Sequence, residues 1–331
     1  GGGVRRGAFE KQGELLRPLR RSGGAAIFVA ISQPAARRLE VRVPQKAPRL
    51  SVADLEALRR QVVRMLRLSD KDDEVAEQFA VASPDLAKQG PVGRLFRSPC
   101  LFEDLVKTFT LCNCGWVRSL SMNEALCKKI GGGAFPSADE LAKVPARRLR
   151  ALCGVGYRAE RIIRLARSVV KGTLDLSALE GLQDASEAEG RCSSIFGLGP
   201  YGVANALQLL GHYDLVAADS ETARHLRQAR GMRSCTLENV RQRATSIYAP
   251  YAPLQFLRYW TELWRTYEDC MGGRACDVDR EQHRLTTAAH MVAPRQKYPL
   301  PRPTKRRRPS AAAAVAAVTP RPKRRREGGR G

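Results

Sequence analysis

The chain has 331 residues, of which 43% are hydrophobic, so it can bury a substantial core and form one or two globular units with tails. No apolar run is long enough to span a bilayer, and the nine cysteines lack a regular pairing pattern, which argues against a membrane protein and a disulfide-rich scaffold and predicts reduced thiols inside a cell. The formal net charge of +24 favours nucleic acid or another anionic surface as partner.

The N-terminal part of the chain predicts a small sheet after a basic segment. Residues 1–24 are rich in Gly and Arg, which is typical of a flexible segment. Residues 25–49 place apolar side chains in strand-like order, which predicts a small antiparallel sheet. From Leu50 to Leu66 the apolar positions change to helical spacing, and Ser51 suits the N-cap of that helix.

Residues 50–272 predict a mainly helical domain. Glycine-containing breaks separate its helices, at residues 90–91, 131–133 and 154–156. The segments 152–157 and 195–200 resemble each other, because each has a Gly-x-Gly turn that leads into a helix with an apolar face. We interpret them as two copies of one hairpin form, which is far too few for a solenoid.

The second of these turns opens the most informative stretch of the chain. Gly197 and Gly199 allow a tight hairpin with unshielded backbone N–H groups, and Pro200 suits the first turn of a helix. The apolar positions that follow recur at helical spacing, at Val203, Ala204, Leu207 and Leu210. A glycine hairpin at a helix N-terminus predicts an anion site, most simply for a phosphate of a nucleic-acid backbone. Asp219 follows that helix.

The remainder of the chain predicts two further helices and a tail. We expect helices at about 220–228 and 253–267, the second of them rich in aromatic residues. Residues 273–331 have the composition of a disordered basic tail. The clusters at 305–309 and 323–326 favour nuclear localisation, and nonspecific affinity for nucleic acid is the alternative.

The hairpin and Asp219 together resemble the signature of the helix-hairpin-helix (HhH-GPD) DNA glycosylase superfamily. The resemblance covers roughly residues 50–270 and is nearer the 3-methyladenine and 8-oxoguanine branches than the iron–sulfur endonuclease III branch. It implies a mainly α fold with two helical subdomains, a small N-terminal antiparallel sheet and a disordered basic C-terminal tail.

The resemblance implies that Asp219 is the catalytic carboxylate and that Gly197 and Gly199 bind the DNA backbone. Taken alone, Asp219 before Ser-Glu-Thr also suits a helix N-cap, and the two roles are compatible. Asp214 is the rival carboxylate. Tyr201 occupies the place where bifunctional members carry a lysine that forms a Schiff base with the sugar, so the resemblance implies a monofunctional enzyme that uses water.

A second family-like segment spans Ser98 to Met122. By resemblance, Asn113 fills the space of a flipped base and Arg118 reads the orphaned partner base; the alternatives are a turn cap and a simple phosphate contact. Trp116 and Trp260 are candidates for the base pocket, and core packing is the alternative for both. The turn at 154–158 resembles a Gly-Tyr-Arg turn of the same branches, for which we expect a structural role.

The cysteines argue against a bound metal or other cofactor. Only Cys235, Cys270 and Cys276 follow the catalytic region, one short of the four closely spaced cysteines that hold an iron–sulfur cluster. Cys112-x-Cys114 has no matching second pair for zinc.

The leading hypothesis is therefore a nuclear, monomeric, monofunctional DNA glycosylase that acts on damaged bases in double-stranded DNA. A DNA-binding protein that keeps the fold but has lost turnover is the alternative, because the hairpin lacks the lysine and Glu221 stands where 8-oxoguanine enzymes tend to carry histidine. A helical scaffold with basic tails is the third possibility.

Overall fold

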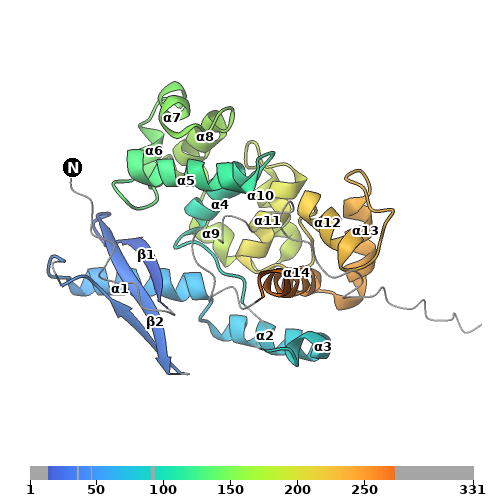
Figure 1. Cartoon of the computed structure of the whole chain (residues 1–331). Coiled ribbons are helices and arrows are strands. Elements are labelled where there is room, and N and C mark those ends of the chain that lie inside the picture. The colour runs from blue at the N-terminus through green and yellow to red at the C-terminus, as the bar shows by residue number, and fades with distance from the viewer. Residues whose placement is uncertain (1–13, 36, 46, 91–93, 273–331) are drawn as a thin grey trace, which may run out of the picture. The chain divides into compact units, whose positions relative to one another are not determined.

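The computed structural model describes residues 14–35, 37–45, 47–90 and 94–272 (Figure 1). The predictions for residues 1–13 and for the tail at 273–331 lie outside the described residues. No helix in the described ranges is both long enough and apolar enough to cross a membrane.

A small antiparallel sheet opens the described chain, as the sequence predicts. Its strands follow one another in space as in sequence: β1 (Leu15–Arg20), β2 (Ala26–Ala35) and β3 (Arg38–Arg42). One face of the sheet packs against the helix α1 (Val52–Leu66), and this contact buries Leu19, Ile27, Val29, Ile31, Leu58, Val62 and Met65. Ser51 caps α1 as predicted, because its hydroxyl accepts a hydrogen bond from the backbone N–H of Asp54.

The sheet begins earlier than the sequence suggests. Strand β1 lies within the stretch expected to be flexible, and it pairs with β2 from Leu15 opposite Ile31 to Arg20 opposite Ala26. Pro18, Arg17 and Arg20 hide its strand character, since Pro and charged residues are uncommon in strands. Pairing with β2 stabilises the strand despite the weak strand propensity of its residues.

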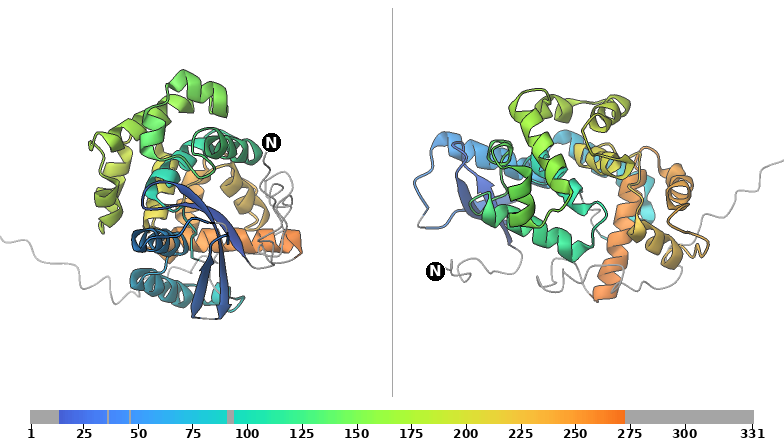
Figure 2. Two further views of the ribbon diagram at one scale, coloured as in Figure 1. Left: turned by 90° about the vertical axis from the view of Figure 1, so that its left-hand side faces the viewer. Right: turned by 90° about the horizontal axis from the view of Figure 1, so that it is seen from above.

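The rest of the described chain is helical (Figures 1 and 2). The further helices are α2 (Asp70–Ala82), α3 (Pro84–Ala87), α4 (Leu101–Leu111), α5 (Trp116–Lys129), α6 (Ala138–Ala142), α7 (Ala146–Cys153), α8 (Arg158–Val170), α9 (Leu176–Gly181), α10 (Ala185–Ser193), α11 (Pro200–Leu210), α12 (Ser220–Gln228), α13 (Val240–Tyr248) and α14 (Gln255–Met271). A short 3₁₀ helix at Ala249–Tyr251 joins the last two.

The helices share two hydrophobic cores. The first lies among α4 to α11 and includes Leu105, Phe109, Ile162 and Leu207. The second joins α2 and α3 to α12, α13 and α14 across a long sequence separation and includes Phe79, Leu226 and Tyr259. The mainly α fold with two helical parts and a small N-terminal sheet, expected from the resemblance, is confirmed.

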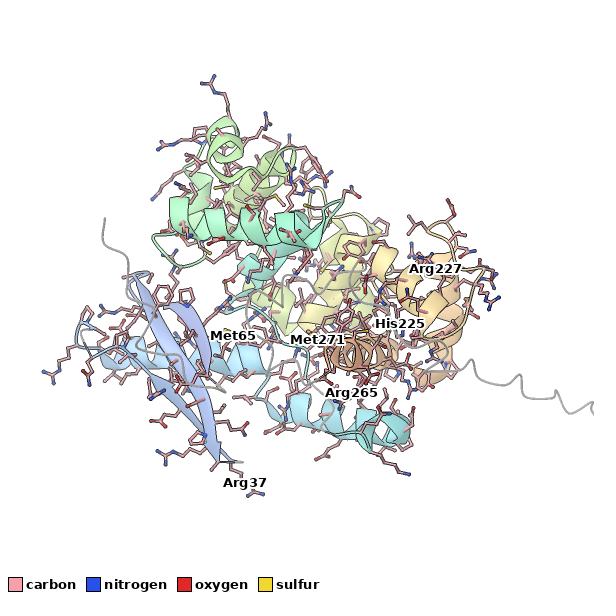
Figure 3. The ribbon with its side chains drawn as sticks, viewed as in Figure 1. Arg37, Met65, His225, Arg227, Arg265 and Met271 are labelled. Carbon is pink, nitrogen blue, oxygen red and sulfur yellow. The ribbon has the colours of Figure 1, made fainter. Side chains whose placement is uncertain are left out.

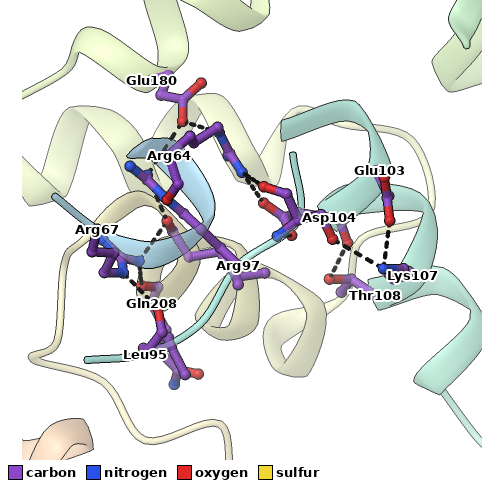
Figure 4. Close-up of polar contacts among 12 residues, drawn as sticks. Arg64, Arg67, Leu95, Arg97, Glu103, Asp104, Lys107, Thr108, Glu180 and Gln208 are labelled. Carbon is purple, nitrogen blue, oxygen red and sulfur yellow. Dashed lines mark hydrogen bonds and ion pairs between the residues drawn. The ribbon is translucent and has the colours of Figure 1, made fainter. Parts of the chain in front are cut away.

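A cluster of three arginines lies at the C-terminal end of α11, and two of them, Arg67 and Arg97, donate hydrogen bonds to its last carbonyl oxygens (Figure 4). Arg67 donates hydrogen bonds to the carbonyl oxygens of Gln208 at 2.9 Å and Leu209 at 2.7 Å. Arg64 pairs with Asp104 and Glu180 at 2.8 and 2.6 Å. Burial, together with the charges of Arg67 and Arg64, lowers the pKa of the third arginine, Arg97, to about 10. The helix that carries the glycine hairpin at one end is therefore held at its other end by α1.

A buried carboxylate in the middle of α14 ties this helix to α12 and α13. Glu262 accepts hydrogen bonds from Arg230 at 2.5 Å, Arg258 at 2.5 Å and Tyr248 at 2.9 Å, and lies 3.4 Å from the ring of His225. Figure 3 shows His225 lying toward α14. Because an unpaired buried charge is costly, this network holds α12 in one position against α14.

Candidate active site

The glycine hairpin between α10 and α11 is formed as the sequence predicts. Gly197 has a φ of +89°, and a Cβ at this position would lie 2.6 Å from Cδ of Arg161. Leu198 is buried beneath the turn. Gly199 differs from Gly197, because its φ is −85° and a Cβ there would meet nothing within 4 Å. It forms the N-cap of α11 without a side-chain cap, so the first N–H groups of the helix are left to an external partner.

Asp219 is the N-cap of α12, and it uses one carboxylate oxygen for that purpose. Its Oδ1 accepts hydrogen bonds from the backbone N–H groups of Glu221 and Thr222, both at 2.9 Å, and from the Thr222 hydroxyl at 3.1 Å. Oδ2 takes no part in this cap. The cap interpretation and a chemical role are therefore compatible within one side chain.

The environment of Asp219 is half-buried and negatively charged. Burial raises the pKa of the Asp219 carboxyl, and the nearby charge of Glu221 adds to the rise, while the hydrogen bonds from Thr222 oppose it. Burial also raises the pKa of Tyr201, followed by the charge of Asp219 and by a hydrogen bond between the two side chains. The helix that follows the hairpin thus places a phenol against the carboxylate.

Thr222 and Tyr259 support this carboxylate from behind. The Thr222 hydroxyl lies 3.0 Å from the hydroxyl of Tyr259, a buried residue of α14. Tyr259 in turn makes edge contacts with the rings of His225 and Tyr248. The position of Thr222, three residues after Asp219, is a capping-box signal in the sequence. The local sequence around Thr222 or Tyr259 does not predict that the two hydroxyl groups form a hydrogen bond.

The turn between α4 and α5 holds Asn113 in a left-handed conformation. Asn113 is exposed and has a φ of +49°, which few residues other than glycine adopt. Buried Arg158 donates hydrogen bonds to the carbonyl oxygens of Phe109 at 3.0 Å, Asn113 at 3.1 Å, and Cys112. This arginine belongs to the Gly-Tyr-Arg turn, so the structural role expected of that turn lies in closing the end of α4.

The other predicted site residues lie in two places. Trp116 and Arg118 are exposed on the first turn of α5, beside Asn113. Trp260 is half-buried on α14, where it stacks on Phe256 with ring centroids 5.8 Å apart and contacts Trp264 edge-on at 5.6 Å. Trp260 therefore belongs to an aromatic row along α14 and not to the Asn113 turn.

A series of neighbouring side chains connects the carboxylate to the Asn113 turn. Tyr201 interacts with Asp219, and its helix α11 packs against α4, which ends at Leu111 just before Cys112. Asn113 follows Cys112, and its Nδ2 lies 3.5 Å from the hydroxyl of Tyr157. The structure thus brings Asp219, Tyr201, Cys112, Asn113 and Tyr157 together from four separate parts of the sequence.

No group of three or more His, Cys, Asp or Glu side chains in the described residues could hold a metal ion. Among the described residues, Cys112, Cys114, Cys235 and Cys270 form no disulfide bond. Cys276 lies outside the described residues.

Residues 106–250 match a family model described as HhH-GPD superfamily base excision DNA repair protein. The protein has the HhH-GPD fold. The matched residues include the Asn113 turn, both glycine turns and Asp219. The resemblance to the HhH-GPD superfamily inferred from the sequence is confirmed by this family model. The solved structures that share the fold include 3-methyladenine and 8-oxoguanine glycosylases.

Two of these structures illustrate the likeness. The 3-methyladenine DNA glycosylase from Archaeoglobus fulgidus is 20% identical, with a TM-score of 0.60 over 78% of this chain and 89% of that one. The Clostridium acetobutylicum 8-oxoguanine glycosylase/lyase, in complex with double-stranded DNA containing cytosine opposite 8-oxoguanine, is 16% identical, with a TM-score of 0.53 over 74% and 87%. No curated protein sequence gave a match. At these identities the likeness concerns the fold alone.

Proposed function

We propose that this HhH-GPD protein is a DNA glycosylase that hydrolyses the bond between a damaged base and its sugar in double-stranded DNA. The observation that carries the proposal is the position of Asp219. Its carboxylate starts α12, uses only Oδ1 in the cap and lies against Tyr201 of the helix that follows the glycine hairpin. The similarity in fold to glycosylases supports the same conclusion.

The chemistry needs one well-placed carboxylate. As the glycosidic bond breaks, the sugar develops oxocarbenium character, which an anionic oxygen stabilises. The same carboxylate orients a water on the anomeric carbon and takes its proton as the new C–O bond forms. The leaving base keeps the electron pair of the broken bond and takes up one proton through solvent, which balances the proton that the carboxylate receives from the water and then releases. We assign these roles to Asp219.

Tyr201 determines the nucleophile in this proposal. A Schiff-base lyase needs an amine beside the sugar, and the place that the resemblance assigns to that amine holds a phenol whose pKa is raised by burial. The neutral phenol does not form an imine. Water is therefore the nucleophile, and the enzyme is monofunctional.

Base release also requires the damaged nucleotide to leave the stack. Asn113 is exposed on a turn that Arg158 holds rigid, and we propose that its side chain fills the vacated space. Arg118 and Trp116 lie next to it on α5 and would contact the partner base and the pocket. We further propose that the protein acts as a monomer in the nucleus.

The pH dependence of base release follows from the raised pKa of Asp219. The reaction needs the ionised carboxylate, so activity should rise with pH through the pKa of this group. We expect the acid limb of single-turnover base release to lie above the ordinary aspartate pKa of about 3.9. In Thr222→Val the limb should move to still higher pH, because the hydroxyl that lowers the pKa is lost. A limb that stays in place would contradict the assignment.

A catalytically inactive DNA-binding protein is the second candidate, and Glu221 favours it. Its carboxylate is held by Arg224 and Tyr267, each at 2.5 Å, and its charge raises the pKa of Asp219. A histidine here would instead favour the ionised aspartate. Weakened ionisation of Asp219 is the physical reason why turnover could be lost while the fold persists.

Incubation with duplexes that bear alkylated, oxidised or deaminated bases tests both candidates. A monofunctional glycosylase leaves abasic sites that become strand breaks only after alkali. Borohydride added during the reaction should trap no covalent protein–DNA adduct. A trapped adduct would show an amine nucleophile and refute the assignment of water.

A further inference from the structure

Helix α7 and Lys143, which caps the end of α6 just before it, carry a concentrated positive charge that the proposed site does not use. Lys143, Arg147, Arg148 and Arg150 are all exposed, and the segment 143–150 contains no acidic residue. We call these four residues the α7 patch. Within the part of the chain that the structure describes, none of the four forms an ion pair.

The local structure explains why these side chains face outward. Leu149 and Cys153 are the buried residues of α7, and their spacing of four residues puts them on one face of the helix. The three arginines lie on the other faces of the helix, together with Ala146, Ala151 and Leu152. Figure 1 shows α7 at the outer edge of the helical unit, next to α8.

A second glycine turn joins α7 to α8. Gly154 and Gly156 have φ values of +64° and +57°, and Val155 between them is fully buried. The α10–α11 hairpin has a different backbone at its second glycine, but it too buries an apolar residue, Leu198, between Gly197 and Gly199. The repeat suspected from the sequence is thus a repeat of the buried apolar residue between two glycines.

Short contacts connect the α7 patch to the Asn113 turn. Nε of Arg150 donates to the carbonyl oxygen of Gly156 at 3.3 Å. Tyr157 follows Gly156 and reaches Asn113. Cys112, which precedes Asn113, is the C-cap of α4, and α4 packs against α11, the helix that carries Tyr201. The Asn113 turn is therefore linked to the proposed site through α4 and α11, and to the α7 patch through Tyr157.

We propose that the α7 patch binds phosphates of the DNA strand that pairs with the damaged strand. This inference rests on the proposed function, because Asp219 and the α10–α11 hairpin then hold the damaged strand and Asn113 lies at the level of the flipped base. In this arrangement the partner strand would pass along the part of the Asn113 turn that Tyr157 and α7 adjoin. Unpaired guanidinium groups bind phosphate oxygens well, since their fork matches the two acceptors.

The dimensions of α7 suit a short stretch of one strand. Eight residues of α helix span about 12 Å, and neighbouring nucleotides of a strand rise by about 3.4 Å. The patch therefore covers about three or four phosphates of the partner strand. An acidic protein segment is the competing occupant, and the experiment below separates it from DNA.

The test is the salt dependence of binding to a duplex that contains a tetrahydrofuran abasic analogue. Each phosphate neutralised contributes about −0.9 to the slope of log affinity against log salt. The double variant Arg147→Gln/Arg148→Gln should therefore reduce the slope by about 2. The matched control is Arg59→Gln/Arg60→Gln, which removes two adjacent exposed arginines of α1 and should leave the slope within about 0.5 of wild type.

Neutral methylphosphonates identify the strand. Placed in the partner strand within about four nucleotides of the orphaned base, on the side facing α7, they should weaken wild-type binding but have little further effect on the α7 double variant. In the damaged strand they should weaken both proteins equally. The inference would be overturned if the α7 double variant kept the wild-type salt slope, or if methylphosphonates in the partner strand weakened binding by the variant as much as binding by wild type. Either result would favour an acidic protein segment as the occupant of the α7 patch.

This readout is independent of catalysis. If wild-type protein binds the duplex with the predicted slope but releases no base from any lesion, the proposed function fails and the α7 contact stands. If base is released and the α7 variant binds with the wild-type slope, the α7 contact alone is refuted. Equal thermal midpoints of the two double variants and wild type confirm that the fold is intact.

Discussion

Asp219→Asn should lower single-turnover base release by about 10²- to 10⁴-fold, the contribution expected of a positioned carboxylate. Asparagine is as good an N-cap as aspartate, so the bond that Oδ1 makes with the start of α12 is preserved. The variant also relieves the burial of a charge whose pKa is raised in the folded state. At pH 7 its thermal midpoint should therefore equal or exceed that of wild type.

Asp214→Asn is the matched control for this prediction. Asp214 is partly exposed in the turn after α11, five residues from Asp219, and was the rival carboxylate in the sequence. Its replacement should leave base release within about threefold of wild type, since surface substitutions have small effects. Full activity in Asp219→Asn, or a large loss in Asp214→Asn, would move the chemistry away from Asp219.

Glu262→Ala should reduce the free energy of unfolding by about 3–5 kcal/mol, the range for breaking a buried ion pair. The substitution leaves Arg230 buried without its carboxylate, while Arg258 keeps Asp85 at 2.5 Å. Urea unfolding at pH 7 measures the effect. Glu268→Gln removes a more exposed carboxylate of the same helix, paired with Arg265, and should cost less than about 1 kcal/mol.

The same network gives stability a definite pH dependence. Burial opposes ionisation of Glu262, but the hydrogen bond with His225 and the charges of Arg230 and Arg258 keep its pKa below the ordinary value. Its contribution is complete above the unfolded-state pKa of about 4.3 and is lost as pH falls through the folded value. Burial lowers the pKa of His225, so stability also falls below about pH 6.5. In Glu262→Ala the part due to Glu262 should disappear.

Local sequence signals were sufficient for the hairpin and the candidate carboxylate. Position 197 requires glycine because its φ is positive and because a Cβ there would clash with the side chain of Arg161. A position that requires glycine can be recognised in the sequence from the glycine itself. The start of α12 at Ser220 could also be predicted, because Asp219 is a strong cap signal. The mainly helical core followed from apolar periodicity in the same way.

Long-range partners could not be predicted. Tyr259 meets Thr222 across 37 residues, and Arg67 caps the end of α11 from 141 residues away. Such contacts depend on how helices pack, which periodicity does not encode. Strand β1 was missed for a related reason, since its pairing with β2 outweighs Pro18 and its arginines. The second role of the Gly-Tyr-Arg turn, joining α7 to the Asn113 turn, needed the structure as well.

The most direct test of the central claim is single-turnover base release by the wild-type protein, in excess over duplexes that each contain one alkylated, oxidised or deaminated base. We predict that at least one lesion yields alkali-dependent strand breaks and that Asp219→Asn abolishes them. Tight binding to a tetrahydrofuran duplex with no base released from any lesion would contradict the account and identify a DNA-binding protein that has lost turnover.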